Sequence, residues 1–411
     1  MNDQLKPKLR PHEAGWIQHN GQRVLYLRER TGLSDRAVAL PATLAPILGF
    51  CDGTRDVERL RAAFLLHSGI DLSTQVIERI LGQLDEALLL ESPTAIAAQQ
   101  AALNAYRSAP YREPHLAGKA YPAEPDALTE MLRQFSEPCS DQAQQEEVTD
   151  SKGAVRGLVS PHIDFARGGH VYARVWQEAS ESIREAEVVV IFGTDHMGDQ
   201  GKLTLTRQSY STPWGVLPTD TSIVDVVAEA IGHDEAFEDE LNHRSEHSIE
   251  LASIWLHYTR NGNACRVVPI LCGSFHHFVA GVADPADSRL GVALAALREA
   301  IRGKRTVVIA AADLAHVGPA FGDTTPFGPV EKAMVSVADR QILSAVEQGS
   351  ADEFFRRLRE EGDRRRVCGL PPIYMALRLL GSSIGHTVEY AQCPADANGG
   401  SLVSIAGVVL R

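Results

Sequence analysis

Histidine side chains follow three apolar segments of this 411-residue sequence, at points where a strand could end. His162 follows GLVSP, His196 follows EVVVIFGTD, and His316 follows RTVVIAAADLA. Because ligands of an open α/β sheet bind outside the carboxyl ends of its strands, these side chains can converge although they are distant in sequence. Imidazole nitrogens together with one thiolate or carboxylate suit a first-row transition metal. Position alone leaves both metal ligation and structural hydrogen bonding open for His162 and His196.

Four further residues could contribute chemistry, and each has an ordinary structural alternative. Asp313, three residues before His316, could cap the turn that follows its strand. Cys368 taken alone is more typical of a buried thiol than of a ligand. Glu246 and His247 open a predicted helix in the segment SEHSIE, where the helix dipole favours acidic groups. A capping arrangement is the alternative there, but the pair carries more titratable chemistry than a cap requires.

The elements that must position these residues are short apolar segments alternating with helical patterns. Continuous β-branched runs of this kind predict strands buried on both faces. The segments are 154–160, 187–193, 203–207, 266–272, 305–313, 386–392 and 401–410. The pattern therefore predicts an α/β fold with a mixed, largely parallel sheet flanked by helices.

The chain divides into three parts by pattern. Residues 1–92 combine an alternating hairpin pattern over 20–33 with two amphipathic helices, which is typical of a small winged-helix domain. Residues 93–112, rich in Ala and Gln, predict a solvated linker helix. Residues 113–411 form the α/β part, interrupted by a polar, low-complexity stretch over 136–153 that we interpret as an insertion.

Composition restricts the class of protein. The 53 acidic residues exceed the 40 Lys and Arg, and the net charge of -13 argues against nucleic acid as a partner. No apolar stretch approaches the roughly 20 residues of a membrane span, and the first residues lack the apolar core of a signal peptide. The six cysteines are scattered, without a CxxC pair. We therefore expect a cytoplasmic protein without a membrane partner.

Six segments from about Pro114 onward resemble, in order, those of the MEMO family, also called AmmeMemoRadiSam system protein B. That family is similar in fold to the class III extradiol dioxygenases. The segments are HLAGKAYPAEPDAL, SPHIDFARGGHVYA, GTDHMG, SEHSIE, AADLAHVG and RVCGLPPIYMAL. Four positions depart from the family pattern: Phe165 replaces a Tyr, Met197 replaces the second His of a pair, and Thr194-Asp195 replace a Pro-Ser.

The resemblance implies a redox metal held by His162, His196 and Cys368. Iron (Fe²⁺) is the first expectation, copper the second and zinc the weakest. Ligand bonds of about 2.0 to 2.3 Å would place the three donor atoms within roughly 4 Å of one another. The dioxygenases use a carboxylate where this chain has Cys368, and a thiolate is a softer donor that favours copper(I) or shifts the iron potential. Dioxygenase activity is therefore an open question.

The resemblance also implies roles for the remaining residues. His316 matches the catalytic base of the dioxygenases, with Asp313 expected to fix its tautomer. Glu246 and His247 are expected to contact the substrate. A neutral imidazole can accept a proton from a phenol or enol near neutral pH. The leading expectation is thus a metal-dependent oxidoreductase related to the dioxygenases.

The first 92 residues resemble the PqqD-like winged helix, which presents peptides to radical-SAM enzymes. The matching features are the hairpin segment VLYLRE, the turn Cys51-Asp52-Gly53-Thr54-Arg55 and the helix end LDEALLLES. The two resemblances imply a radical-SAM protein and an AMMECR-type protein as partners, with a peptide ligand at the winged helix. A non-catalytic adaptor that binds metal or peptide is therefore the alternative to an enzyme.

Overall fold

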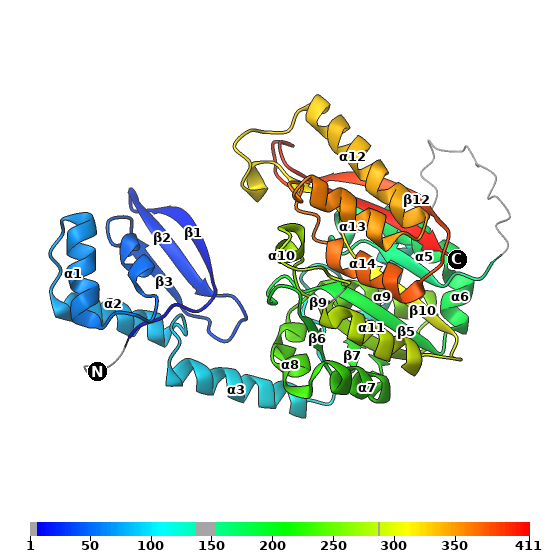
Figure 1. The fold of residues 1–411 in the computed structure, drawn as a ribbon, viewed down its shortest axis with the longest axis horizontal. Helices are drawn as coiled ribbons and strands as arrows, with labels where there is room; N and C mark the ends of the chain where they lie inside the picture. Colours follow the sequence, from blue (N-terminus) through cyan, green and yellow to red (C-terminus); the bar gives the residue numbers. More distant parts are fainter. Residues whose placement is uncertain (1–5, 137–152, 287) are drawn as a thin grey trace. The chain divides into compact units, whose positions relative to one another are not determined.

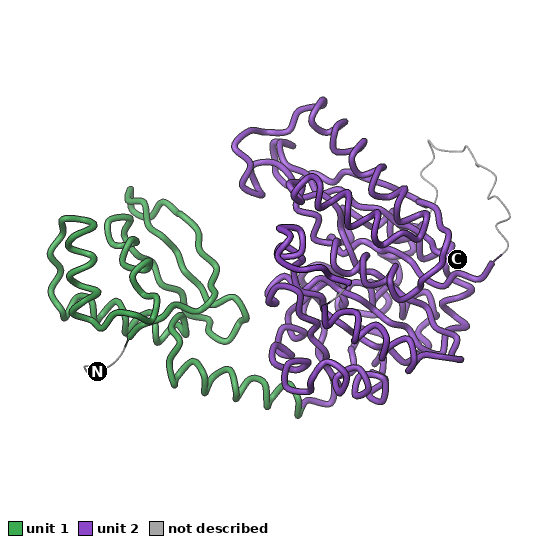
Figure 2. Tube along the Cα trace, in the orientation of Figure 1, with its two compact units in different colours: residues 1–108 green, residues 109–411 purple. Residues whose placement is uncertain are grey.

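The computed structural model describes residues 6–136, 153–286 and 288–411, so most of the predicted insertion over 136–153 lies outside the described residues. The chain forms two compact units, residues 1–108 and residues 109–411, which Figure 2 distinguishes by colour. We call them unit 1 and unit 2.

Unit 1 is a small antiparallel sheet covered by helices. The strands are β1 (His12–His19), β2 (Gln22–Glu29) and β3 (Ala37–Pro41), in the order β1-β2-β3, and the helices are η1 (Ala45–Phe50), α1 (Val57–Ser68), α2 (Thr74–Glu86) and α3 (Pro93–Ser108). Ser73 caps α2 by accepting a hydrogen bond from the amide of Val76. Leu27, Phe64 and Leu84 lie in its fully buried core.

The hairpin of unit 1 differs from the one predicted over 20–33. Strands β1 and β2 pair from His12 with Glu29 to His19 with Gln22, so the turn lies at Asn20-Gly21. Both turn residues have positive φ, 49° and 75°, as a type I′ hairpin turn requires. The prediction was wrong because it took this turn as the start of the hairpin.

Unit 2 confirms the predicted α/β class. Its main sheet has eight strands in the order β11-β13-β4-β10-β5-β9-β6, with β12 paired to β13. Strands β4, β10, β5 and β9 are parallel, and the outer pairings are antiparallel. The strands are β4 (Gly157–Ser160), β5 (Val188–Thr194), β6 (Leu203–Leu205), β9 (Arg266–Cys272), β10 (Thr306–Ala311), β11 (His316–Val317), β12 (Gly385–Pro394) and β13 (Leu402–Leu410). A separate pair, β7 (Tyr210–Thr212) and β8 (Gly215–Leu217), forms a small second sheet.

Helices cover both faces of this sheet (Figure 1). Along β5, Val188, Val190 and Phe192 contribute to one core and Val189 and Ile191 to the other. Residues of α5 (Phe165–Glu178) and α9 (Ser248–Thr259) pack into the second core, together with α4 (Pro125–Ser136). The other core receives α7 (Thr221–Ile231), α8 (His233–Phe237), α10 (His276–Val279), α11 (Arg289–Ala300), α12 (Pro329–Glu347), α13 (Ala351–Glu360) and α14 (Leu370–Leu380). Short helices α6 (Ser180–Glu185), η2 (Glu240–Arg244) and η3 (Pro319–Phe321) complete the unit.

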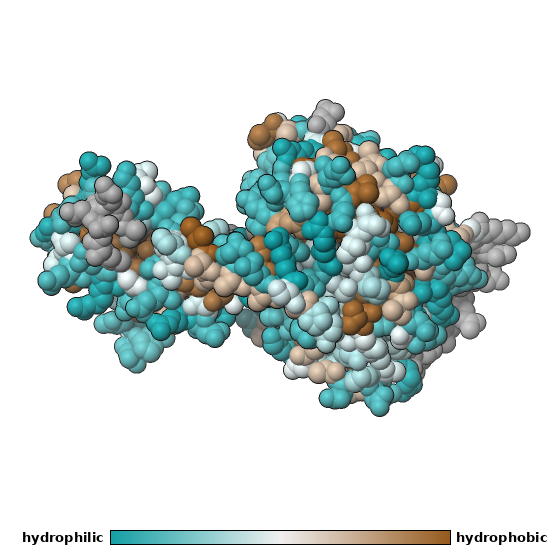
Figure 3. Space-filling view, turned by 90° about the horizontal axis from the view of Figure 1, so that it is seen from below, coloured by the Kyte–Doolittle hydropathy of each residue, from teal (hydrophilic) through white to brown (hydrophobic). Residues whose placement is uncertain are grey.

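The surface is mainly hydrophilic on the face drawn in Figure 3, where apolar side chains form only small groups. Among the described residues, none of the helices combines the length and apolar character needed to cross a membrane.

Candidate functional site

Three of the predicted residues lie together at the carboxyl edge of the parallel strands. His162 lies in the connection from β4 to α5, His196 follows β5, and Cys368 precedes α14. Their possible ligand atoms all lie within 4.8 Å of one another. The Sγ atom of Cys368 lies 3.2 Å from Nε2 of His162. Residues separated by up to 206 positions thus form one group, which we call the donor pocket.

Both imidazoles of the donor pocket are held through Nδ1. Nδ1 of His162 lies 3.0 Å from the carbonyl oxygen of Ala311. Nδ1 of His196 lies 3.0 Å from Oε2 of Glu246. An oxygen acceptor at Nδ1 fixes the proton there and leaves Nε2 as a lone-pair donor, which is the usual arrangement of metal-ligating histidines. The residues present therefore fit a metal ion.

Glu246 orients two histidines at once. Its Oε1 lies 3.1 Å from Nδ1 of His247, while Oε2 faces His196. The rings of His196 and His247 stack with centroids 4.9 Å apart and planes inclined by 16°. The carboxylate also accepts hydrogen bonds from the amides of His196, His247 and Ser248, at 3.2, 2.8 and 3.0 Å. These contacts position both imidazoles, and His196, Glu246 and His247 form a second group whose possible ligand atoms lie within 4.8 Å of one another.

Asp313 lies beside His162, which corrects the expected pairing of Asp313 with His316. Its Oδ1 accepts hydrogen bonds from the amides of His162 and Ile163, at 2.8 and 3.2 Å. Its Oδ2 lies 3.7 Å from Nε2 of His162. His316 instead has Nδ1 at 3.1 Å from the carbonyl oxygen of Leu314, two residues back in the chain. The short turn between β10 and β11 directs the carboxylate of Asp313 back toward the loop after β4.

The charges of the donor pocket favour a thiolate. Burial raises the pKa of Cys368, but the imidazoles of His162 and His316 oppose it and lower the pKa to about 5. Burial lowers the pKa of His162, yet Asp313 and Cys368 outweigh it and raise the pKa to about 9. The thiolate is the form of cysteine that ligates metals, and a cation would replace the imidazolium proton.

A cavity of about 280 Å³ opens beside the donor pocket. Its lining includes His196, Cys368, Phe275 and Arg366. The side chain of His196 is 37% exposed and that of His247 38%, whereas Glu246 is 3% exposed. A small molecule can therefore reach the histidine rings while the carboxylate that orients them stays shielded from water.

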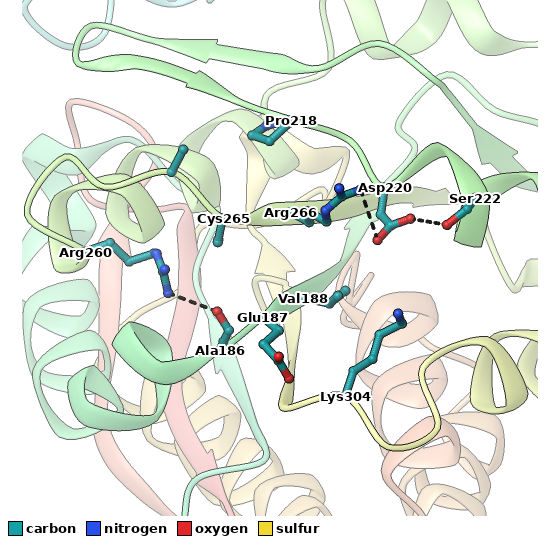
Figure 4. A pocket seen from close by; sticks show the side chains of 11 residues that line it. Ala186, Glu187, Val188, Pro218, Asp220, Ser222, Arg260, Cys265, Arg266 and Lys304 are labelled. Atoms are coloured by element: carbon teal, nitrogen blue, oxygen red, sulfur yellow. Dashed lines mark hydrogen bonds and ion pairs between the residues drawn. The ribbon is translucent and has the colours of Figure 1, made fainter.

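A larger cavity, of about 670 Å³, lies at the opposite edge of the sheet (Figure 4). It borders Val188 and Arg266, the first residues of β5 and β9. Its acidic groups already have partners within the chain: Asp220 faces Arg266 at 3.7 Å, and Glu187 faces Arg305 at 3.5 Å. We therefore place the candidate site at the carboxyl edge, where ligands of α/β sheets bind.

Two buried residues near the donor pocket were not predicted from the sequence. Arg112 forms an ion pair with Glu250, in the first turn of α9, with 2.6 Å between Nη1 and Oε2. The hydroxyl of Tyr121 donates to the same carboxylate at 2.6 Å. Tyr121 lies in the segment HLAGKAYPAEPDAL, so the resemblance pointed to its surroundings, but nothing in the pattern around Arg112 indicated a buried role.

The sequence profile described as "Memo-like protein" matches residues 112–409, almost all of unit 2. The chain belongs to this family. The predicted family membership is thereby confirmed, and the six motifs that suggested it lie within the matched residues.

Relatives named as MEMO1 family proteins share this region. One from Aquifex aeolicus is 26% identical over 411 residues, covering 98% of this chain and all of the relative. One from Archaeoglobus fulgidus is 30% identical over 306 residues, covering 73% of this chain and 99% of the relative. One from Methanopyrus kandleri is 28% identical over 308 residues, with 73% and 99% covered. The two archaeal relatives are thus close in length to unit 2, whereas the Aquifex relative has the length of the whole chain.

Proposed function

We propose that the protein is a metal-dependent redox protein in which His162, His196 and Cys368 hold iron or copper. The observation that carries this proposal is the convergence of one thiol with two imidazoles whose Nδ1 atoms are both engaged. Two histidines, one anionic ligand and open positions suit Fe²⁺, and the softness of the thiolate makes copper(I) the second candidate and zinc a third.

When bound, such a metal would supply Lewis acidity and one-electron chemistry to a molecule in the adjoining cavity. His316 is the proposed proton acceptor: its Nδ1 faces the carbonyl of Leu314, so Nε2 is free to take a proton. The ring of His247 stacks on that of His196, and its Nδ1 faces Glu246. We propose that His247 contacts the substrate through Nε2. Asp313 holds the loop of His162, and Glu246 holds both other rings.

Metal binding to Cys368 variants tests this proposal. The purified protein is loaded anaerobically with Fe²⁺, Cu⁺ or Zn²⁺ in separate samples, and bound metal is counted after gel filtration. Cys368→Ser is expected to lose the metal, because serine is not a thiolate donor. Cys265→Ser, which changes a buried free thiol at the opposite edge of the sheet, is the control and is expected to bind normally. Equal binding by the two variants would refute the assignment of Cys368.

His316→Ala separates a catalytic role from ligation. It is expected to retain the metal but to lose about 10²- to 10⁴-fold in turnover once a substrate is found. Loss of the metal from His316→Ala would make it a ligand.

The five described cysteines, Cys51, Cys265, Cys272, Cys368 and Cys393, are free, which suits the cytoplasmic location we propose.

The second candidate function is an adaptor that presents a peptide to a radical-SAM enzyme, alongside an AMMECR-type protein. The observation that favours it is the exposure of large apolar side chains on the β1–β2 hairpin of unit 1: Trp16 is 47% exposed, Ile17 45% and Tyr26 36%. Such residues are common at sites where proteins bind partners. Calorimetric titration with each candidate partner, using Trp16→Ser and wild type, tests this role. Equal affinities would exclude the hairpin as the contact.

A further inference from the structure

A buried ion pair connects the first residues of unit 2 to the segment that carries Glu246. Nη1 of Arg112 lies 2.6 Å from Oε2 of Glu250, and both side chains are only 1% exposed. The same guanidinium donates from Nε to the carbonyl oxygen of His243 at 2.7 Å, and from Nη2 to that of Glu246 at 3.0 Å. Two N–H groups of the rigid guanidinium thus hold backbone carbonyls of the loop that enters α9, and a third contacts the carboxylate of Glu250 in the first turn of that helix.

The residues around Arg112 are held in return. The carboxylate of Glu250 accepts the amides of His115 and Leu116, at 2.8 and 2.7 Å, and the hydroxyl of Tyr121. The backbone of Arg112 pairs with Ser209 and Ser211. Residues 109–121 therefore form a strap fastened to the segment 243–250, which we name the Glu246 segment.

We propose that Arg112 is a positioning residue of the donor pocket, acting through the Glu246 segment. This inference rests on the proposed function, because the donor pocket is taken to be a metal site. A hydrogen bond weakens steeply as its angle and length depart from ideal values. Because Glu246 holds Nδ1 of both His196 and His247, a small displacement of its backbone releases two imidazoles together. Arg112 makes that displacement costly.

The first test needs no metal. In metal-free protein, nitrogen NMR of the imidazoles reports which ring nitrogen carries the proton. Burial lowers the pKa of His196, but Glu246 and Cys368 raise it well above its usual value, so the spectra are recorded at alkaline pH, where wild type is expected to show the Nδ1–H form for His196 and His247. In Arg112→Met, both rings are expected to give a mixture of the two tautomers, and their Nδ1 protons to exchange with water at least about tenfold faster. Leu297→Ala, a buried substitution on α11, controls for general destabilisation and should retain the wild-type tautomers.

The second test uses Co²⁺ alone as a probe, monitored by its thiolate charge-transfer absorption. Loss of an outer partner typically costs 10- to 100-fold in metal affinity, and we expect about tenfold for Arg112→Met. Leu297→Ala should bind as wild type does. Wild-type tautomers together with wild-type Co²⁺ affinity in Arg112→Met would overturn the proposal, whatever happens to its melting temperature.

Two further variants keep the tests decisive. If Arg112→Met does not fold, Arg112→Lys is read by the same criteria, because it keeps a charge at Glu250 but lacks the planar fork for the two carbonyls. The pair Arg112→Met with Glu250→Gln removes both buried charges and should still show mixed tautomers. If wild type itself binds no Co²⁺, the metal proposal fails, while the tautomer measurement still decides the role of Arg112.

Discussion

Acid should destabilise unit 2 through one buried histidine, His243. Its Nε2 lies 3.0 Å from the carbonyl oxygen of Thr204 and its Nδ1 2.7 Å from the hydroxyl of Tyr210, so the neutral ring satisfies both partners. Burial lowers the pKa of His243 to about 3, and the charge of Arg112 adds to this, although the hydrogen bond to Thr204 opposes it. The unfolded chain has the ordinary pKa of about 6.5.

The direction of the pH effect on stability follows from this difference between the folded and unfolded pKa of His243. Below pH 6.5 the unfolded chain takes up a proton that the folded chain does not, so the stabilisation present at higher pH is lost as the pH falls from 6.5 toward 3. Each pH unit in this window costs about 1.4 kcal/mol, which gives a loss of about 2 kcal/mol between pH 8 and pH 5. The neutral variant His243→Gln removes this contribution and should lose correspondingly less over the same interval.

Urea unfolding at pH 8 and pH 5 measures the effect, with the fluorescence of the buried Trp176 and Trp255 reporting on unit 2. His233→Gln, which removes an exposed imidazole, is the control and should match wild type. The quantity compared is the change in the free energy of unfolding between the two pH values. If wild type and His243→Gln lose the same amount, His243 is not the acid-sensitive group and the reasoning is refuted.

Three other predictions concern particular residues. Gly369→Ala should destabilise unit 2 by about 1 to 3 kcal/mol, because the added Cβ would lie 2.3 Å from the carbonyl oxygen of Asp313; thermal unfolding measures this. Gly82→Ala, with open space in helix α2, should instead stabilise unit 1 by about 0.5 to 1 kcal/mol, and any loss of stability would contradict it. Asp313→Ala should weaken metal binding about 10- to 100-fold without abolishing it, since it removes the support of the His162 loop; chelator competition decides, and unchanged affinity would exclude that support.

The sequence predicted the fold of unit 2 because its central strands β5, β9 and β10 are rich in β-branched residues and are buried on both faces. All seven predicted segments contain strands, from β4 to β13. The short strands β7, β8 and β11 were missed, whereas β6, which also has three residues, was predicted because it lies in the alternating segment LTLTR. The hairpin of unit 1 was misplaced although Asn20-Gly21 is a recognised signal for a type I′ turn.

The candidate site was predictable where the sheet itself positions the residue. His162 and His196 follow β4 and β5, the parallel strands on either side of β10, so the strand-end rule was enough to group them. Cys368 was singled out among the candidate residues, but its role as a ligand came only from the family resemblance, because its place before α14 has no local signature. The partner of Asp313 could not be predicted, because it depends on the direction of a short turn. The partner of Nδ1 of His162 could not be predicted either, because it is the backbone carbonyl of Ala311 and no side-chain pattern indicates such a contact.

The boundary between the units lies after Ser108, four residues before Arg112. This position matters for the design of fragments that contain unit 2 alone. The predicted start of the α/β domain, residue 113, would cut away Arg112 and leave Glu250 as a buried carboxylate without its counter-charge. Removing one partner of such a pair typically costs 3 to 5 kcal/mol. A shortened protein that begins at residue 109 keeps the whole strap, so a difference of four residues should separate a fragment that folds well from one that does not.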